Sequence, residues 1–365
     1  MTMDKDKKEK AISNINKEIS KIDKKENQVF FFVIDTKGVP SGSLEYIYQL
    51  AKIVKDEGYD VTMLHTEEEF VGVESWLGKE FSSIKHLNVN GGEVATTPSD
   101  VLFIPEIYAQ VMNQTKNLPC KRVAILQNYD YVVEQMPFSA QWGDLGIMNG
   151  ISNSDYMTRR LLASFPYVKM QKVTPFVSDM FRNDNEPKKM IVNVISKYQD
   201  DIKKIVKPFY WKHNVFKWVT FRELRNDSKE EFAKKLREGA ITIIVDDNAS
   251  FMYSALEAMK SGSIVMCKLP DTELEWMYDE EGKLRNCCVW FDDYDMLHKQ
   301  IASVVRAWIT DRVPTKLAEE ADNVLKDYTY DRTKTEFLKA FNSILEQRKN
   351  EMKNLLTNLD KEEEK

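Results

Sequence analysis

The chain has 365 residues, of which 42% are hydrophobic and 30% charged, and its formal net charge is -6. This length allows two domains, the composition is that of a globular protein, and the acidic balance gives no bulk electrostatic reason to expect nucleic acid as a partner. No apolar run approaches the roughly 20 residues that span a bilayer, and the opening MTMDKDKKEK lacks the apolar core of a secretory signal. The spacing of the four cysteines is typical neither of a disulfide framework nor of a zinc site. We therefore expect a cytoplasmic protein with reduced thiols.

The chain begins with residues 1–27, a stretch rich in Lys, Glu and Asp that we expect to form a solvated, partly helical extension. The first domain starts at Val29 with a continuous apolar run, which predicts a central strand. A glycine-containing turn that ends near Gly42 leads into a predicted helix over 44–58, and residues 59–64 form the next strand. This strand–helix–strand order implies a parallel sheet with a right-handed crossover.

Further strands of the first domain are predicted at 84–89, 101–104, 122–126 and 145–148. Polar residues follow three of these strands, namely Pro105-Glu106, Gln127-Asn128-Tyr129 and residues 149–154. Because the carboxyl ends of parallel strands share one edge of a sheet, where ligand sites form, we expect these polar groups to gather there. Ser152 or Ser154 can cap the helix that follows.

A linker is predicted over 168–189, where a strand-like beginning gives way to a polar run between Pro175 and Pro187. Strands and helices then alternate again, which implies a second α/β domain. The predicted strands lie at 190–195, 215–220, 241–245, 264–267 and 288–291, and the helices at 202–208, 228–239, 255–260 and 294–310. The chain ends in a predicted helix over 326–347 and an acidic tail.

The stretch from Ile241 to Pro270 has the strongest functional pattern in the chain. Its β-branched apolar run predicts a strand buried on both faces, which Asp246 and Asp247 end at the carboxyl edge of the sheet. The loop and helix that follow direct backbone N–H groups and a positive helix end toward that edge, which suits a phosphate. One acidic residue, Glu257, lies within this helix.

Two interpretations of Glu257 are open. Ser254-Ala-Leu-Glu257 is a capping-box sequence, so a helix that begins at Ser254 would use the Glu257 carboxylate to bond its own first turn. A helix that begins nearer Ser250 would place Glu257 in the helix interior, where its carboxylate is free to face a ligand. We favour the second interpretation because of a family likeness.

Several segments resemble, in order, the retaining group 1 (family 4) glycosyltransferases of the GT-B type. The glycine-containing turn, the helix LEYIYQLAKIVKDEG and the strand YDVTML look like the start of that family's first domain. VKMQKVTPFVSDMF is similar to its hinge segment, SALEAMKSG to its Glu-Ala-Met helix, and YTYDRTKTEFLKAF to its final helix. The resemblance covers the chain from Val29 to about Gln347, and Glu-Ala-Met is its most specific string.

The resemblance implies how a nucleoside-diphosphate sugar would be bound. Glu257 matches the family's Glu that accepts hydrogen bonds from the ribose hydroxyls of the donor, a role that suits a carboxylate. Ser250, Phe251, Met252 and Tyr253 match the loop whose backbone N–H groups hold the diphosphate. Gly42 falls in the family's first glycine loop, and we expect it to be among the residues that bind the donor.

The resemblance also implies which residues assist catalysis. Lys197 falls where the family usually has Arg, and Lys203 lies within one residue of its Lys; together they would neutralise the leaving diphosphate. Lys197 keeps the charge of Arg but not its bidentate fork. Ala249 stands where the family has a second Glu, and Asp247 and Asn248 are near enough in the sequence to replace it. Solvated side chains are the alternative for both lysines.

The predicted fold is α/β and of the GT-B type, with two Rossmann-like parallel-sheet domains that face a central cleft and C-terminal helices that cross back to the first. The expected divisions are an extension (1–27), an acceptor-side domain (28–173), a donor-binding domain (174–325) and a C-terminal helix with its tail (326–365).

The expected function is sugar transfer from a UDP- or GDP-sugar to a glycan or glycolipid, without a metal ion. Two alternatives stay open. The first is a non-catalytic sugar-nucleotide-binding or scaffold relative, because the first-domain loop has Gln127-Asn128-Tyr129 where many members place a catalytic His. The second is a phage-type enzyme that acts on modified DNA bases.

Overall fold

The structure, a computed structural model, describes residues 5–33, 41–90, 94–248 and 250–361. Contacts within the chain divide it into two compact units. Unit 1 comprises Met1–Glu74, Lys79–Val173 and Lys334–Lys365, and unit 2 comprises Ser75–Gly78 and Thr174–Thr333. Each unit is built around its own parallel sheet.

Unit 1 contains a seven-stranded parallel sheet in the order β3-β2-β1-β4-β5-β6-β7. The central strand β1 is an apolar run whose residue Val29 pairs with Val61 on one side and Val101 on the other. Its neighbour β4 supplies Phe103, which stacks on Phe31 with 4.6 Å between the ring centroids. The strands are β1 Gln28–Phe32, β2 Asp60–His65, β3 Lys85–Asn88, β4 Val101–Pro105, β5 Lys121–Leu126, β6 Asn149–Ser152 and β7 Lys169–Lys172.

Two helices of unit 1, α2 and α5, follow signals in the sequence. Gly58, with φ +94°, follows the end of α2, and the Ser154 side chain accepts a hydrogen bond from the Met157 N–H at the start of α5. The helices are α1 Lys5–Asp23, α2 Gly42–Asp56, α3 Ala109–Gln114, α4 Tyr129–Gln135 and α5 Asp155–Ser164, with a 3-10 turn η1 Lys79–Phe81.

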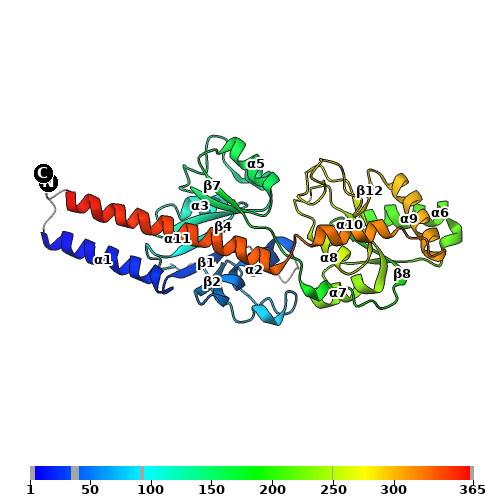
Figure 1. Cartoon of the computed structure of the whole chain (residues 1–365), viewed down its shortest axis with the longest axis horizontal. Helices are drawn as coiled ribbons and strands as arrows, with labels where there is room; N and C mark the ends of the chain where they lie inside the picture. Colours follow the sequence, from blue (N-terminus) through cyan, green and yellow to red (C-terminus); the bar gives the residue numbers. More distant parts are fainter. Residues whose placement is uncertain (1–4, 34–40, 91–93, 249, 362–365) are drawn as a thin grey trace. The chain divides into compact units, whose positions relative to one another are not determined.

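The last helix, α11 (Tyr330–Lys361), begins in unit 2 and continues through unit 1. In unit 1, its Phe337 and Phe341 rings pack against Phe103 of β4. Farther along, α11 lies beside α1 (Figure 1), and Lys349 Nζ is 3.0 Å from Asp23 Oδ1. The first sheet therefore buries part of its core under the end of the chain.

Unit 2 contains a five-stranded parallel sheet in the order β12-β11-β10-β8-β9. Every residue of the inner strand β10 is buried, as its continuous apolar run predicts. The strands are β8 Lys189–Ser196, β9 Thr220–Glu223, β10 Gly239–Val245, β11 Ile264–Lys268 and β12 Val289–Phe291. The helices are α6 Gln199–Lys212, α7 Lys229–Glu238, α8 Tyr253–Lys260, α9 Tyr294–Ile309 and α10 Thr315–Leu325, with 3-10 turns η2 Asp179–Phe181 and η3 Asn214–Phe216.

Two predicted strands are misplaced along the sequence. The strand predicted at 145–148 is β6, which instead covers the buried but polar Asn149–Ser152. Residues 149–152, expected in a polar loop after a strand, are therefore the strand itself. The prediction of a strand at 215–220 is wrong, because Asn214–Phe216 forms a 3-10 turn. The strand of this region is β9, a partly exposed edge strand that begins at Thr220. The prediction of two Rossmann-like parallel-sheet domains is confirmed.

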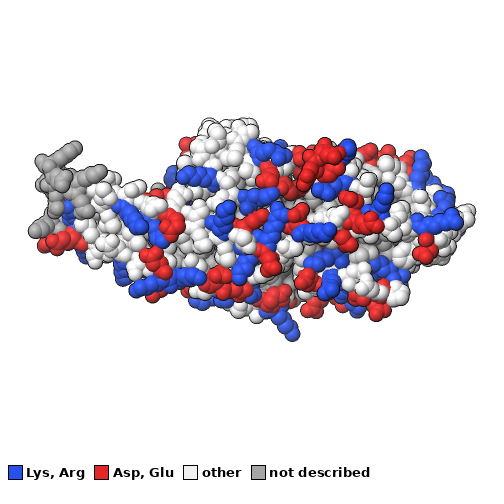
Figure 2. Space-filling model, in the orientation of Figure 1, with Lys and Arg blue, Asp and Glu red and all other residues white. Residues whose placement is uncertain are grey.

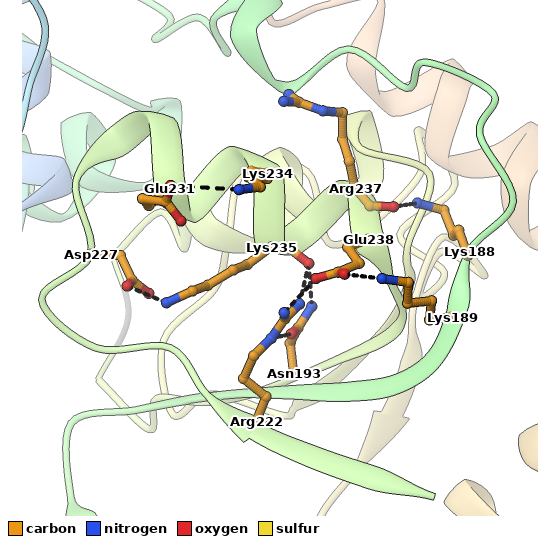
Figure 3. Close-up of polar contacts among 10 residues, drawn as sticks. All are labelled: Lys188, Lys189, Asn193, Arg222, Asp227, Glu231, Lys234, Lys235, Arg237 and Glu238. Atoms are coloured by element: carbon orange, nitrogen blue, oxygen red, sulfur yellow. Dashed lines mark hydrogen bonds and ion pairs between the residues drawn. The ribbon is translucent and has the colours of Figure 1, made fainter.

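A network of polar contacts joins the C-terminal end of α7 to strands β8 and β9 of unit 2 (Figure 3). The Arg222 guanidinium donates to Asn193 Oδ1 at 2.9 Å, to Glu238 Oε2 at 2.6 Å and to the Lys235 carbonyl at 2.7 Å. Lys189 binds the other Glu238 oxygen, and these two cations hold the pKa of Glu238 at about 2. With this end fixed, the opposite end of α7 is held at the carboxyl edge of the sheet.

Candidate functional site

The candidate site lies at the carboxyl edge of the five-stranded sheet in unit 2. Register places the last residue of β8, Ser196, opposite Val245, the last residue of β10. Lys197 and Asp246 follow these two strand ends and form an ion pair. The first turns of α7 and α8 follow the ends of β9 and β10 in the chain, so charged side chains from four elements are available at this edge.

Glu257 lies in the interior of α8, because the helix begins at Tyr253 and not at Ser254. Met252 is the N-cap residue, with a left-handed φ of 58°, and no side chain caps the helix there. The third helical position, which a capping box requires for its Glu, is therefore Ala255. The capping-box interpretation of Glu257 is wrong, and the interpretation that requires an interior position is the one compatible with the structure.

The Glu257 carboxylate is buried, with 5% of the residue exposed, and it forms an ion pair with Lys229. Lys229 is the first residue of α7, and its Nζ lies 4.8 Å from the centroid of the Phe181 ring. A cation in the first turn of a helix opposes the helix dipole, so this lysine is in an unfavourable place unless an acid compensates for it. That mismatch, just after the capping residue Ser228, is the sequence signal by which Lys229 could have been found.

Two side chains of the loop that leads into α8 are directed into the core of unit 2. Phe251 and Met252 are buried in the core of unit 2, and the Trp276 indole N–H donates to the Phe251 carbonyl at 2.8 Å. Ser250 and Tyr253 are partly exposed, while Ala249 lies outside the described residues. The first N–H groups of an α-helix have no acceptor within the helix, so the start of α8 can bind an anion through its backbone.

Of the predicted catalytic residues, Lys197 and Asp247 lie at the strand ends. Lys197 Nζ is 2.9 Å from Asp246 Oδ1, and 58% of its side chain is exposed. Asp247 Oδ1 is 2.5 Å from Nζ of Lys268, the last residue of β11. Exposed ion pairs of this kind stabilise a protein by about 0–1 kcal/mol, so an anionic ligand can replace an acid as the partner of either lysine.

Lys203 is placed differently. It lies within α6, 66% of its side chain is exposed, and its ion-pair partner is Asp200 in the same helix, with 3.1 Å between the charged atoms. Within the part of the chain that the structure describes, no contact joins Lys203 to Lys197 or Glu257. Its role at the diphosphate stays a prediction.

In unit 1, Gly42 is the first residue of α2, and residues 34–40 of the predicted glycine loop lie outside the described residues. The Gln127 side chain donates to the Ser43 carbonyl at 3.1 Å, and the Asn128 side chain caps α4. Both residues are buried. The segment Gln127-Asn128-Tyr129, where many family members place a catalytic His, is thus held by structural hydrogen bonds.

A buried acid, Glu106, fixes the same segment. It follows β4, only 3% of it is exposed, and its Oε1 accepts the N–H groups of Asn128 at 2.6 Å and Gln127 at 3.0 Å. Burial raises the pKa of Glu106 from 4.5 to about 7, although these two N–H donors act in the opposite direction. The sequence marks Glu106 as a polar strand end, but its burial depends on how the strands assemble.

The raised pKa of Glu106 predicts that the stability of the protein depends on pH between pH 4.5 and about 7. In this window the folded protein retains a proton that the unfolded chain has released, so the free energy of unfolding falls as the pH rises, by at most about 3 kcal/mol. Chemical denaturation of wild type and Glu106→Gln should therefore show wild type losing stability relative to the variant across the window. A constant difference between the two proteins would contradict the assignment, and Glu134→Gln, at an exposed position of α4, controls for loss of surface charge.

Among the described residues, no group of three or more His, Cys, Asp or Glu side chains is arranged to hold a metal ion. The four cysteines are free and buried. None of the helices in the described ranges has the length and apolar content needed to cross a membrane. On the face shown in Figure 2, basic and acidic side chains are interspersed.

The two parallel sheets, with a last helix that begins in unit 2 and continues through unit 1, define a GT-B fold. A glycosyltransferase from Rickettsia africae ESF-5 is similar over 87% of this chain and 98% of its own, at 13% identity and a TM-score of 0.61. No protein-family model and no curated protein matches the sequence.

Two further solved structures share the fold, each at 10% identity. The catalytic domain of starch synthase IV from Arabidopsis thaliana, bound to ADP and acarbose, matches 88% of this chain and 99% of its own, with a TM-score of 0.56. Sucrose-phosphate synthase from Thermosynechococcus elongatus matches 91% of this chain and 100% of its own, with a TM-score of 0.53. These similarities confirm the predicted fold.

Proposed function

We propose that the protein is a retaining glycosyltransferase that transfers a sugar from a nucleoside-diphosphate sugar, a UDP- or GDP-sugar, to a glycan or glycolipid acceptor. One observation carries the proposal: a buried carboxylate, Glu257, lies in the interior of the helix at the carboxyl edge of the second sheet of a GT-B fold. A neighbour of this fold was solved with ADP and a carbohydrate-like ligand, acarbose, which supports this class of donor.

In this proposal each part of the edge has one task. Glu257 accepts hydrogen bonds from the ribose hydroxyls, and the backbone of residues 250–253 binds the diphosphate. Lys197 and Lys203 neutralise the charge that develops on the leaving diphosphate, and Asp247 orients the donor in place of the missing second Glu. The acceptor hydroxyl attacks from the face that the diphosphate leaves, and a phosphate oxygen takes its proton, so the reaction retains the anomeric configuration. In this scheme the two lysines, rather than a metal ion, neutralise the leaving diphosphate.

A thermal-shift screen over UDP-, GDP-, ADP- and dTDP-sugars tests donor binding. A donor present at about a hundred times its dissociation constant stabilises the native state by roughly 2.7 kcal/mol, which is a shift of several degrees for a chain of this size. We expect a UDP- or GDP-sugar to give this shift. A melting temperature that none of the four donor classes changes would contradict the proposal.

A non-catalytic sugar-nucleotide-binding protein is the second candidate, because the buried Gln127 and Asn128 provide no titratable group in the segment where many family members place a catalytic His. Release of nucleoside diphosphate from the donor found in the screen separates the two functions. An enzyme releases the nucleoside diphosphate, at least slowly, as it transfers the sugar to an acceptor or to water. Wild-type protein that binds the donor and releases none would favour the second candidate.

A further inference from the structure

We propose that Arg225 binds the diphosphate of the donor and supplies the guanidinium that is absent at position 197. This inference rests on the proposed function, because it assigns one more residue to the same donor site. It makes a nucleoside diphosphate, rather than a nucleoside monophosphate, the chemical group that the edge recognises.

Arg225 contacts the backbone of Ser196, the residue before Lys197, although Arg225 and Lys197 are 28 positions apart in the sequence. Val194 of β8 pairs with Glu223, the last residue of β9, and this register brings the residue two positions after Glu223 next to Ser196. The Arg225 Nη2 donates to the Ser196 carbonyl at 3.2 Å, and Ser196 is the residue directly before Lys197. Lys197, which pairs with Asp246 after β10, and Arg225, which follows β9, therefore place a cation on each side of the end of β8.

The carbonyl that Arg225 binds belongs to a well-fixed residue. The Ser196 hydroxyl donates to Asp201 Oδ2 at 2.6 Å, and the same hydroxyl oxygen accepts the Tyr198 N–H at 3.1 Å. Asp201 is buried and also accepts a hydrogen bond from the Tyr294 hydroxyl at 2.7 Å. Arg225 thus has a defined position, which reduces the entropy that binding a ligand would cost.

The guanidinium keeps unused donors at the surface of the site. Its Nε binds Glu223 Oε1 at 2.8 Å and one Nη2 hydrogen binds Ser196, which leaves the Nη1 hydrogens for a ligand. The side chain is 32% exposed, so solvent reaches it. A planar guanidinium binds phosphate through two parallel hydrogen bonds, which the point charge of Lys197 cannot do.

The competing explanation is that Arg225 only forms a surface ion pair with Glu223. Such a pair contributes about 0–1 kcal/mol, and in this explanation the contact with the Ser196 carbonyl only joins the ends of β8 and β9. The two explanations differ in what they predict for ligands with one and two phosphates.

The test is calorimetric titration of the full chain with UDP, GDP and ADP, and with the monophosphate of whichever base binds. We expect Arg225→Gln to weaken binding of the diphosphate by about tenfold or more and binding of the monophosphate by less than about threefold. Arg225→Lys should restore part of the loss, because it returns the charge without the fork. Lys234→Gln, at an exposed position in the middle of α7, should bind as wild type does.

Two results would overturn the inference, and they are distinguishable. If wild type binds a diphosphate and Arg225→Gln binds it equally well, or loses the monophosphate and diphosphate to the same extent, Arg225 does not bind the diphosphate but the proposed function stands. If wild type binds none of the three diphosphates, the proposed function fails and this inference fails with it. Thermal melts of both variants establish that they are folded.

Discussion

Replacing Glu257 with alanine is expected to abolish measurable release of nucleoside diphosphate and to destabilise unit 2. In the proposed function this change removes two charge-assisted hydrogen bonds to the ribose hydroxyls, and donor binding should weaken by at least about a hundredfold. The ion pair with Lys229 would also be broken, and removing one partner of a buried pair costs roughly 3 kcal/mol or more. Titration with the donor and chemical denaturation measure the two effects separately.

A double substitution separates the role of Glu257 in binding from its role in folding. Lys229→Met combined with Glu257→Gln removes both charges, so the buried cation is no longer left without its acid, and we expect much of the lost stability to return. Donor binding should not return, because a neutral amide is a weaker acceptor for the two hydroxyls. Wild-type turnover in Glu257→Gln would show that the carboxylate is not a donor ligand.

Replacing Arg122 with methionine is expected to destabilise unit 1 by about 4 kcal/mol. Its buried guanidinium donates through Nη1 to the carbonyls of Met112 and Leu145, at 2.9 and 2.8 Å, and through Nη2 to those of Lys116 and Gly146, at 3.2 and 3.3 Å. Methionine fills a similar volume but leaves these carbonyls without their donor, at about 1 kcal/mol for each.

Calorimetric melting is the measurement for Arg122, because it resolves the transitions of two units if they unfold separately. Arg122→Lys should lie between wild type and Arg122→Met, since an ammonium cannot reach both pairs of carbonyls at once. Arg312→Met, at an exposed position of unit 2, should change stability by less than about 0.5 kcal/mol. A melting profile of Arg122→Met equal to that of wild type would contradict the role of this residue.

The strands that could be predicted from the sequence are those whose own side chains form a continuous apolar run. Strands β1 and β10 are continuous apolar runs, and their prediction is confirmed. Strand β6 carries no such signal, because its burial comes from β5 and β7 on either side. A Cβ atom at Gly150 would lie 2.5 Å from Met170 Sδ of β7 and 3.3 Å from the Ala124 carbonyl of β5, so both neighbouring strands approach this position closely, which sequence periodicity does not reveal.

The candidate site was less predictable, because its geometry depends on contacts between distant segments. The start of α8 follows from a left-handed Met252, a conformation that is uncommon for residues other than glycine, and from the Trp276 side chain that binds the preceding carbonyl. Local sequence offered both a capping box and an interior Glu257, and it could not decide between them. The partners of Glu257 and Glu106 were likewise set by how strands and helices assemble.

The path of α11 has a consequence for the synthesis of the protein. Phe337 and Phe341 complete the packing around Phe103, yet a ribosome makes them after all of unit 2. During synthesis, unit 2 can therefore fold before the core of unit 1 is complete, and the aromatic side chains of the first sheet stay exposed until α11 has been made. Premature termination before Phe337 would leave that surface exposed and make the truncated product a target for chaperones and proteases.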